Sequence, residues 1–112
     1  FLALGAAGGA RIVPAIVQVI SRVIDHGMPL EQALSAGRVY QLPDRLLVEN
    51  HKNVFWKDSK TMDLLKQSSI KIEEIKTTAQ FGRVHAIQYN VSGNWIGAAD
   101  PDWSGTAKGL KN

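Results

Sequence analysis

The chain has 112 residues, of which 45% are apolar and 21% charged, with a formal net charge of +3 and no cysteine. This composition is ordinary for a folded domain and excludes the disordered, highly charged class, as well as disulfide and thiolate-metal sites. The basic residues are scattered among acidic ones, without the stripe that binds nucleic acid. The apolar stretch 12–24 is shorter than the roughly 20 residues of a membrane span. We expect no nucleic-acid partner and no membrane span.

The chain begins with Phe1 and not with methionine, and it opens with the segment FLALGAAGGA. This segment resembles the end of a signal peptide in composition, but no basic region precedes it and a helical pattern follows directly. We expect residues 1–112 to be a single partial domain that is part of a longer protein.

The first third of the chain predicts a strand, a glycine-rich turn and a helix. Phe1 to Leu4 is short and apolar, as a buried strand is, and the small residues 5–10 follow as a turn. From Arg11 the apolar residues recur at helical spacing, and Gly27 stands where a helix commonly terminates. The residues expected on the buried face are Ile12, Ile16, Val19, Ile20, Val23 and Ile24, and those expected near the opposite face are Gln18, Ser21, Arg22 and Asp25.

A second, shorter helix is expected to begin near Pro29 and to end before Gly37. It should pack beside the first helix, because the connection between them is short. Its inward-facing residues are expected to be Leu30, Ala33 and Leu34.

The middle of the chain predicts a strand, a loop and a third helix. Arg45 to Glu49 has the composition of a strand, and residues 50–57 have that of a loop. Asp58 or Ser59 is a suitable cap for a helix that runs to about residue 67. The residues expected to face inward from this helix are Met62, Leu64 and Leu65.

The last third predicts strands and a loose tail. Ile70 to Glu73 alternates as a half-buried strand does, and residues 84–91 and 95–99 flank the turn Ser92-Gly93-Asn94 as a hairpin. The tail from Asp100 is expected to be a surface loop or a frayed end. The fold class is therefore α/β (α+β), with a mixed or antiparallel sheet and helices packed on it.

Gly8 and Gly9 are the candidate catalytic residues. They stand where a strand passes into a helix, so their backbone N–H groups can face a bound oxygen with no side chain between. An oxyanion hole requires such donors. A tight structural connection is the alternative interpretation. The spacing matches neither the dinucleotide-binding nor the P-loop pattern, and we expect no cofactor.

The three histidines, His26, His51 and His85, lie far apart in the sequence and lack the close spacing of a metal pair, so we expect no zinc site. His26 is expected to be a helix C-terminal cation or a partly buried side chain. His85 alternates with apolar residues along a strand and points either to solvent or to a cleft. No role in proton transfer is assigned to either.

Arg38 follows the second helix and could bind a substrate carboxylate, or it could pair structurally with Asp44 or Glu49. Glu73 and Glu74 are expected on opposite faces of a strand, which disfavours a two-carboxylate mechanism. The tryptophans are expected to pack at the core or its edge, and they are Trp56, Trp95 and Trp103.

Five segments, in order and at matching spacing over nearly the whole chain, resemble the γ-glutamyltranspeptidase family. They are Gly5-Ala6-Ala7-Gly8-Gly9-Ala10-Arg11-Ile12, Val23-Ile24-Asp25-His26-Gly27-Met28, Leu42-Pro43-Asp44, Leu47-Val48-Glu49 and Gly97-Ala98-Ala99-Asp100-Pro101. The resemblance implies the C-terminal part of the small subunit of an N-terminal-nucleophile hydrolase with an αββα sandwich. In that family the precursor cleaves itself, and the freed terminal threonine attacks a γ-glutamyl amide such as glutathione.

The resemblance assigns Gly8 and Gly9 to the oxyanion-hole pair. It places the threonine nucleophile, and the residues that hold the glutamyl group, before Phe1, so this chain alone should be inactive. Its expected partners are the large-subunit and nucleophile-bearing segments of the same precursor and a γ-glutamyl substrate. Family members are usually periplasmic or extracellular, and we expect the same here.

The chain departs from the family pattern beside the glycine pair. Where the family commonly has Gly-Ser-Pro-Gly-Gly-Ser, this sequence has Ala6, Ala7 and Ala10, so the serine hydroxyls and the proline are lost. Two alternatives to γ-glutamyl transfer stay open, the second because this chain carries no nucleophilic threonine of its own. One is a related acylase that acts on another amide, and the other is a non-catalytic structural or interaction fragment.

Overall fold

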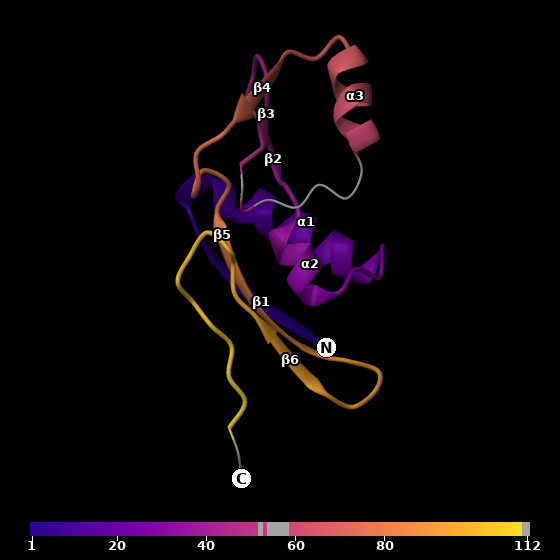
Figure 1. Cartoon of the computed structure of the whole chain (residues 1–112), viewed down its shortest axis with the longest axis vertical. Coiled ribbons are helices and arrows are strands. Elements are labelled where there is room, and N and C mark those ends of the chain that lie inside the picture. The colour runs from indigo at the N-terminus through magenta and orange to yellow at the C-terminus, as the bar shows by residue number, and fades with distance from the viewer. Residues whose placement is uncertain (52, 54–58, 111–112) are drawn as a thin grey trace.

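The structure, a computed structural model, describes residues 1–51, 53 and 59–110. These residues form two three-stranded sheets with helices packed beside them. The molecule is elongated, with principal extents of 54, 25 and 23 Å. Figure 1 shows the first sheet in the lower half, two helices at its centre and the second sheet at the upper end.

The first sheet is antiparallel and has the order β1-β5-β6. Its strands are β1 (Leu2–Ala7), β5 (Arg83–Tyr89) and β6 (Trp95–Ala98). The predicted hairpin between β5 and β6 is confirmed, and Gly93 in its turn has a φ of 82°, which glycine adopts without strain. The first strand runs to Ala7 and not only to residue 4, because every residue of β1 pairs with β5.

Helix α1 (Ile12–Ile24) follows a short 3-10 turn, η1 (Gly9–Arg11), and packs with α2 (Leu30–Ser35) on one face of the first sheet. Both helices confirm the prediction, and Gly27 has the left-handed φ of 61° expected after a helix. The buried residues that form the core of this layer are Ala15, Val19, Val23, Leu30, Ala33, Leu34, Val84, Ala86 and Ala98.

The predicted orientation of α1 is partly wrong. Ile20 and Ile24 are 40% and 64% exposed, whereas Ala15 is buried. Gln18 faces the protein, since its side-chain amide donates to the carbonyl of Val39 and accepts from the same residue's N–H. The inward face of α1 thus includes the polar side chain of Gln18, which satisfies the backbone N–H and carbonyl of Val39.

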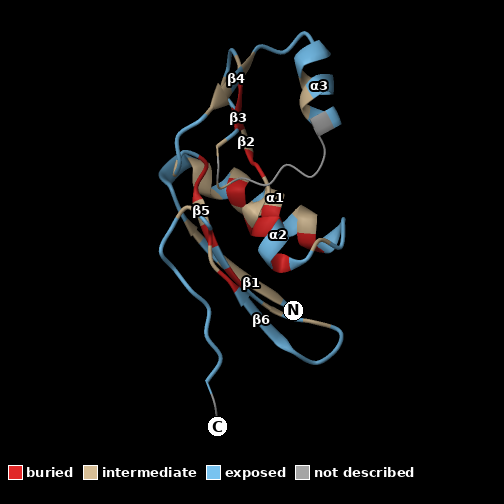
Figure 2. Ribbon diagram, in the orientation of Figure 1, coloured by how far each residue is buried: buried red, intermediate tan, exposed pale blue. Residues whose placement is uncertain are grey.

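The second sheet is mixed and has the order β2-β3-β4. Its strands are β2 (Val39–Gln41), β3 (Leu46–Glu49) and β4 (Ile72–Ile75). Strand β3 was predicted, β2 was not, and β4 begins two residues later than expected. The pairing of β3 with β4 is parallel, and the connection between them passes through α3 (Ser59–Gln67). Figure 2 shows β3 buried along its length.

Helix α3 lies at the surface. Met62 and Leu65 are partly buried as expected, but Leu64 is 58% exposed, so its predicted inward orientation is wrong. Asp58, one of the two predicted caps, and most of the predicted loop 50–57 lie outside the described residues. Within the described part of the chain, no helix has both the length and the apolar character needed to cross a membrane.

The start of the C-terminal tail contradicts the prediction of a frayed end. Asp100 is only 2% exposed, and the side chain of Asp102 is 3% exposed. Both carboxylates have partners far away in the sequence, Arg38 and His51. The composition of a Gly- and Pro-rich tail does not predict such partners. The remainder of the tail, residues 103–110, is exposed as expected.

Candidate functional site

The Gly8–Gly9 turn lies between β1 and α1, as the sequence predicts. Gly8 has φ 139° and Gly9 has φ 60°, and both residues are exposed. These values favour glycine, because a Cβ is strained in this region. Gly8 is the N-cap of η1, and no side chain of the described residues caps the turn. The first N–H groups of the turn are therefore not occupied by a capping side chain.

A third glycine, Gly82, packs against the Gly8–Gly9 turn. A Cβ built on Gly8 would lie 2.8 Å from the Cα of Gly82, and one built on Gly82 would lie 3.2 Å from the carbonyl oxygen of Arg11. The two backbones approach so closely that neither position has room for a side chain without movement. Gly82 was not singled out from the sequence, although its place directly before β5 is a usual signal of a constrained turn.

Arg38 holds the segment that carries Gly82. Its side chain is 2% exposed, and Nη1 lies 2.9 Å from Oδ2 of Asp100 and donates to the carbonyl of Gly82 at 3.0 Å. Oδ2 of Asp100 also accepts the backbone N–H of Val84 at 2.9 Å. Of the two interpretations of Arg38, the structure favours pairing within the protein, but the acidic partner is Asp100 and neither Asp44 nor Glu49. Glu49 instead accepts the backbone N–H of Arg38.

Two charged groups near Arg38, Arg22 and Glu49, have shifted pKa values. Arg22 donates to the carbonyls of Ala33, Ala36 and Gly37 at the end of α2. Burial first, and then the nearby positive charge of Arg38, lowers the pKa of Arg22 to about 10. Burial raises the pKa of Glu49, and hydrogen bonds from His51 and from the Arg38 N–H oppose that rise. The region is thus a partly compensated cluster of buried charges.

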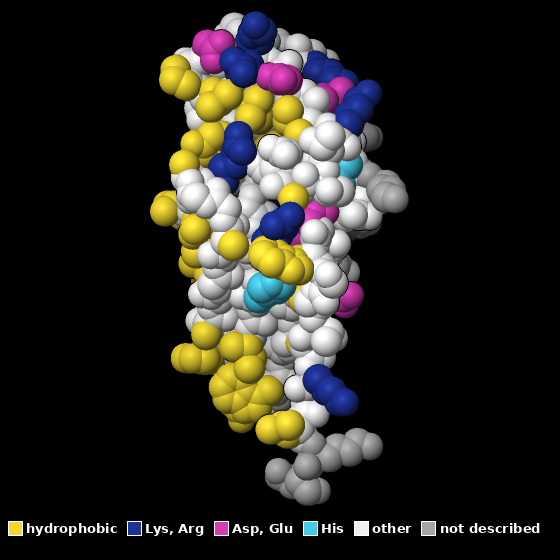
Figure 3. All heavy atoms as spheres, turned by 90° about the vertical axis from the view of Figure 1, so that its left-hand side faces the viewer, with side chains coloured by type: hydrophobic (Ala, Val, Ile, Leu, Met, Phe, Trp, Pro, Cys, Tyr) yellow, Lys and Arg dark blue, Asp and Glu magenta, His cyan; other side chains and the backbone are white. Residues whose placement is uncertain are grey.

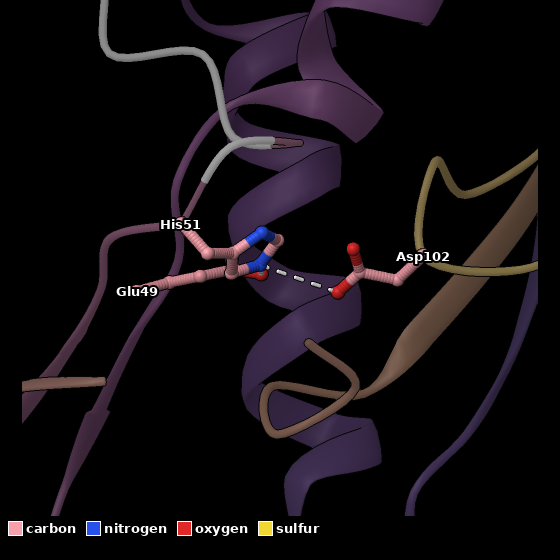
Figure 4. A group of neighbouring side chains, drawn as sticks. All are labelled: Glu49, His51 and Asp102. Atoms are coloured by element: carbon pink, nitrogen blue, oxygen red, sulfur yellow. Dashed lines mark hydrogen bonds and ion pairs between the residues drawn. The ribbon is translucent and has the colours of Figure 1, made fainter. Parts of the chain in front are cut away.

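Glu49 and His51 lie at the end of β3 and face Asp102 on the loop after β6 (Figure 4). Nε2 of His51 lies 2.8 Å from Oε1 of Glu49 and 3.4 Å from Oδ2 of Asp102. All three side chains are at most 5% exposed. Asp102 also accepts the N–H of Ala79, a non-glycine residue with φ 65°. The cluster therefore joins the end of β3 to the loop after β6 and to the segment before β5.

These three residues are ligand types for a divalent cation, and one ligand atom from each lies within 4.8 Å of the others. However, Nδ1 of His51 accepts the backbone N–H of Asn53 at 3.2 Å, which assigns the ring proton to Nε2. A metal-ligating histidine instead uses its second nitrogen as a donor. The geometry is that of one N–H directed at two carboxylates. The expectation that the chain has no zinc site stays a prediction.

The other candidates from the sequence lie apart from this network or at its edge. His26 is exposed just beyond α1, and Glu73 pairs with Arg45 at 2.6 Å on the surface of the second sheet. His85 is exposed, its Nδ1 accepts the N–H of Asp100, and its ring meets Trp103 edge-on. The side chain of Glu74 accepts from Asn50 and lies near Lys66. The ring of Trp95 contacts those of Phe1 and Tyr89. Trp56 lies outside the described residues.

The face of the first sheet that is turned away from α1 and α2 is open. Along β5, Val84 and Ala86 are buried, whereas Ile87 and Tyr89 are each 43% exposed. Figure 3 shows a group of hydrophobic side chains at the lower end of this side of the molecule and further hydrophobic side chains toward its upper end. Tail residues 105–109 lie beside part of this face and border an open groove of about 740 Å³.

This arrangement agrees with comparisons to known proteins. The sequence profile described as "Gamma-glutamyltranspeptidase" matches residues 1–110. The chain belongs to this family. The glutathione hydrolase proenzyme of Escherichia coli K12 is 29% identical over 103 residues, which are 90% of this chain and 16% of that protein.

Two solved structures show the fold. γ-Glutamyltranspeptidase from Pseudomonas nitroreducens, complexed with L-DON, has a TM-score of 0.76 and 30% identity, over 98% of this chain and 55% of that one. Cephalosporin acylase from Bacillus halodurans has a TM-score of 0.81 at 22% identity, over 97% of this chain and 20% of that one, and shows the fold alone. The expected α+β fold of N-terminal-nucleophile hydrolase type is confirmed. The chain spans only part of these relatives.

Proposed function

We propose that this chain is the C-terminal portion of the small subunit of a γ-glutamyltransferase or glutathione hydrolase. The complete protein would cleave γ-glutamyl amides such as glutathione and pass the γ-glutamyl group to water, an amino acid or a peptide. The observation that carries this proposal is the exposed Gly8–Gly9 turn in a chain whose family is established. The nucleophilic threonine would come from another segment of the same precursor.

Gly8 and Gly9 would act through their backbone N–H groups. When the threonine hydroxyl attacks the amide carbon, the carbonyl oxygen gains negative charge, and donors fixed in advance stabilise it. Three features support this role, namely the left-handed φ values, the exposure of both glycines and the absence of a side-chain cap among the described residues. A Cβ on Gly9 would meet no atom within 4 Å, so space for a substrate is available there.

The other segments of the precursor are the proposed partners. Apolar residues at helical spacing remain exposed on α1, where Val13 and Val17 are 69% and 57% exposed. Phe1 and Trp95 are 77% and 61% exposed at one end of the open face of the first sheet. Uncovered apolar surface on both a helix and a sheet favours burial against further layers of the same fold. We also propose a periplasmic or extracellular location, on family resemblance alone.

Two measurements on the full-length protein test this function. Intact mass and N-terminal sequencing should find a cleaved precursor whose smaller product starts with threonine. Turnover of γ-glutamyl-4-nitroanilide should exceed that of other acyl anilides. A processed protein that cleaves only other acyl anilides would be an acylase, and an unprocessed protein without turnover would support a structural role. Either result would contradict the proposal.

A further inference from the structure

Residues 76–82 connect β4 to β5 and lie against the Gly8–Gly9 turn, and we call them the backing turn. The contact is made by Gly82, since a Cβ built on Gly8 would lie 2.8 Å from the Cα of Gly82. No side chain separates the two backbones at this point, so a movement of one displaces the other. The position of the Gly8–Gly9 turn therefore depends on what fixes the backing turn.

The backing turn contains a residue in an unfavourable backbone conformation. Ala79 has φ 65° and is the only non-glycine residue with a positive φ in the described part of the chain. In this region the Cβ of an L-residue approaches the following carbonyl oxygen, and the conformation persists only where other contacts hold it. Oδ2 of Asp102 supplies such a contact, because it accepts the backbone N–H of Ala79 at 3.0 Å.

Asp102 is itself fixed by two groups. Nε2 of His51 lies 3.4 Å from the same Oδ2 atom, and both side chains are 3% exposed (Figure 4). The backbone N–H of Asp102 donates to Oδ1 of Asp100 at 3.0 Å. Burial limits the access of water, which could otherwise replace the carboxylate as the acceptor for Ala79. The His51–Asp102 pair is therefore a fixed acceptor for the strained residue of the backing turn.

We propose that Asp102, oriented by His51, is a positioning residue for the oxyanion-hole donors of the Gly8–Gly9 turn. Its hydrogen bond fixes the backing turn, and the backing turn limits where Gly8 can lie. This inference rests on the proposed function and adds a residue that acts through the backbone and not through contact with substrate. Oxyanion-hole donors bind the transition state more strongly than the ground state, so a displaced turn lowers kcat and leaves KM nearly unchanged.

The test compares variants of the full-length protein with γ-glutamyl-4-nitroanilide as the substrate. Asp102→Ala removes the acceptor, whereas Asp102→Asn keeps an oxygen for the Ala79 N–H. The double variant Asp102→Ala with Ala79→Gly lacks the acceptor but also lacks the strain, because glycine adopts this φ freely. Leu30→Ala is the stability control, since it leaves a cavity at a core side chain that is 2% exposed. kcat, KM and urea unfolding are measured for each variant.

Asp102→Ala should lower kcat about tenfold and change KM less than about twofold. Asp102→Asn should keep kcat within about threefold of wild type, and the double variant should recover most of the loss. Leu30→Ala should lower the free energy of unfolding and leave kcat unchanged. This pattern separates positioning of the turn from a general loss of stability.

A second pair of variants disturbs the backing turn without altering the buried His51 cluster. Ala79→Val places a β-branched side chain at φ 65°, which such residues rarely adopt, so it should shift the turn and lower kcat. Thr78→Val, at the exposed neighbour, is the matched control and should leave kcat within about twofold of wild type. Where Asp102→Ala gives no folded protein, an unchanged kcat in Ala79→Val contradicts the inference.

Amide hydrogen exchange gives a readout that does not depend on catalysis. In Asp102→Ala, exchange should become faster in the backing turn and also in peptides that span Gly8 to Arg11, where the Arg11 N–H donates to the Gly8 carbonyl. Leu30→Ala should not reproduce this pattern.

Two results would overturn the inference and leave the proposed function standing. One is faster exchange in the backing turn alone, and the other is a fall in kcat that Ala79→Gly does not restore. A processed wild-type protein that cleaves no γ-glutamyl anilide would instead contradict the proposed function. The exchange measurement would then still decide whether Asp102 fixes the Gly8–Gly9 turn.

Discussion

The two sheets are stabilised by different interactions. The first sheet and its two helices enclose an apolar core, built from residues such as Val19, Leu34 and Val84, each at most 2% exposed. The second sheet is joined to this layer by polar contacts, including the Arg38–Asp100 pair and the His51 cluster. Apolar packing stabilises the first layer. Paired charges, Arg38 and Asp100, instead hold Gly82 against the Gly8–Gly9 turn.

The Arg38–Asp100 pair and the His51 cluster form the junction between the two sheets. Breaking this junction should have the largest effect on stability. Asp100→Asn removes the charge that compensates Arg38 in a site where both side chains are at most 2% exposed. We expect a loss of about 3–5 kcal/mol, because an unpaired buried charge remains. Urea unfolding of the full-length protein measures it. Asp44→Asn, in the exposed pair with Arg45, is the matched control and should cost at most about 1 kcal/mol.

Cutting into the apolar core should have the next largest effect. Leu34→Ala in α2 removes buried methyl groups and leaves a cavity, so we expect a loss of about 2–5 kcal/mol. Leu64→Ala in α3 makes the same chemical change at a side chain that is 58% exposed, and it should cost less than about 0.5 kcal/mol. Equal unfolding midpoints for the two variants would contradict the difference between the layers.

The junction should also respond to pH, and the core should not. Since burial raises the pKa of Glu49, the native state keeps a proton that the unfolded chain has already lost. Stability contributed by this group therefore falls as pH rises from the usual carboxyl value to the raised one. Glu49→Gln, which keeps an acceptor for the Arg38 N–H, should gain stability relative to wild type over that range. A constant difference in unfolding midpoint from about pH 4 to about pH 8 would contradict this.

The glycine turn itself should show the smallest effects. Gly9→Ala places a Cβ in open space at φ 60°, which should cost about 1–2 kcal/mol. Gly8→Ala should cost more, because its Cβ would lie 2.8 Å from the Cα of Gly82. Thermal unfolding of both variants measures this order, and a Gly9 variant less stable than the Gly8 variant would contradict the described backbone contact.

Local patterns predicted the first layer better than the second. The periodicity of α1, the small residues of the turn and the alternation of β5 depend on neighbours in sequence, and each element formed as expected. The three residues of β2 are too short a segment to give a pattern. The parallel pairing of β3 with β4 depends on a long crossover, which no local signal specifies.

The candidate site was predicted in the same uneven way. Gly8 and Gly9 stood out because glycine at a strand-to-helix turn has a conformational meaning. The sequence predicted Asp100 and Asp102 to lie in a surface loop or frayed end. Their partners Arg38 and His51 lie more than 50 residues earlier, so no local pattern indicates the pairing. A buried ion pair between distant segments leaves no periodicity in the sequence, so only the folded chain reveals it.

The role of the glycine turn is tested most directly by removing a backbone donor. Gly9 and Gly27 have φ values of 60° and 61°, and neither would bring a Cβ within 4 Å of another atom. Gly9→Pro and Gly27→Pro in the full-length protein therefore impose similar backbone strain. We expect kcat for γ-glutamyl-4-nitroanilide to fall about 10²- to 10³-fold in the Gly9 variant only. Equal kcat values in the two variants would contradict an oxyanion role for this turn.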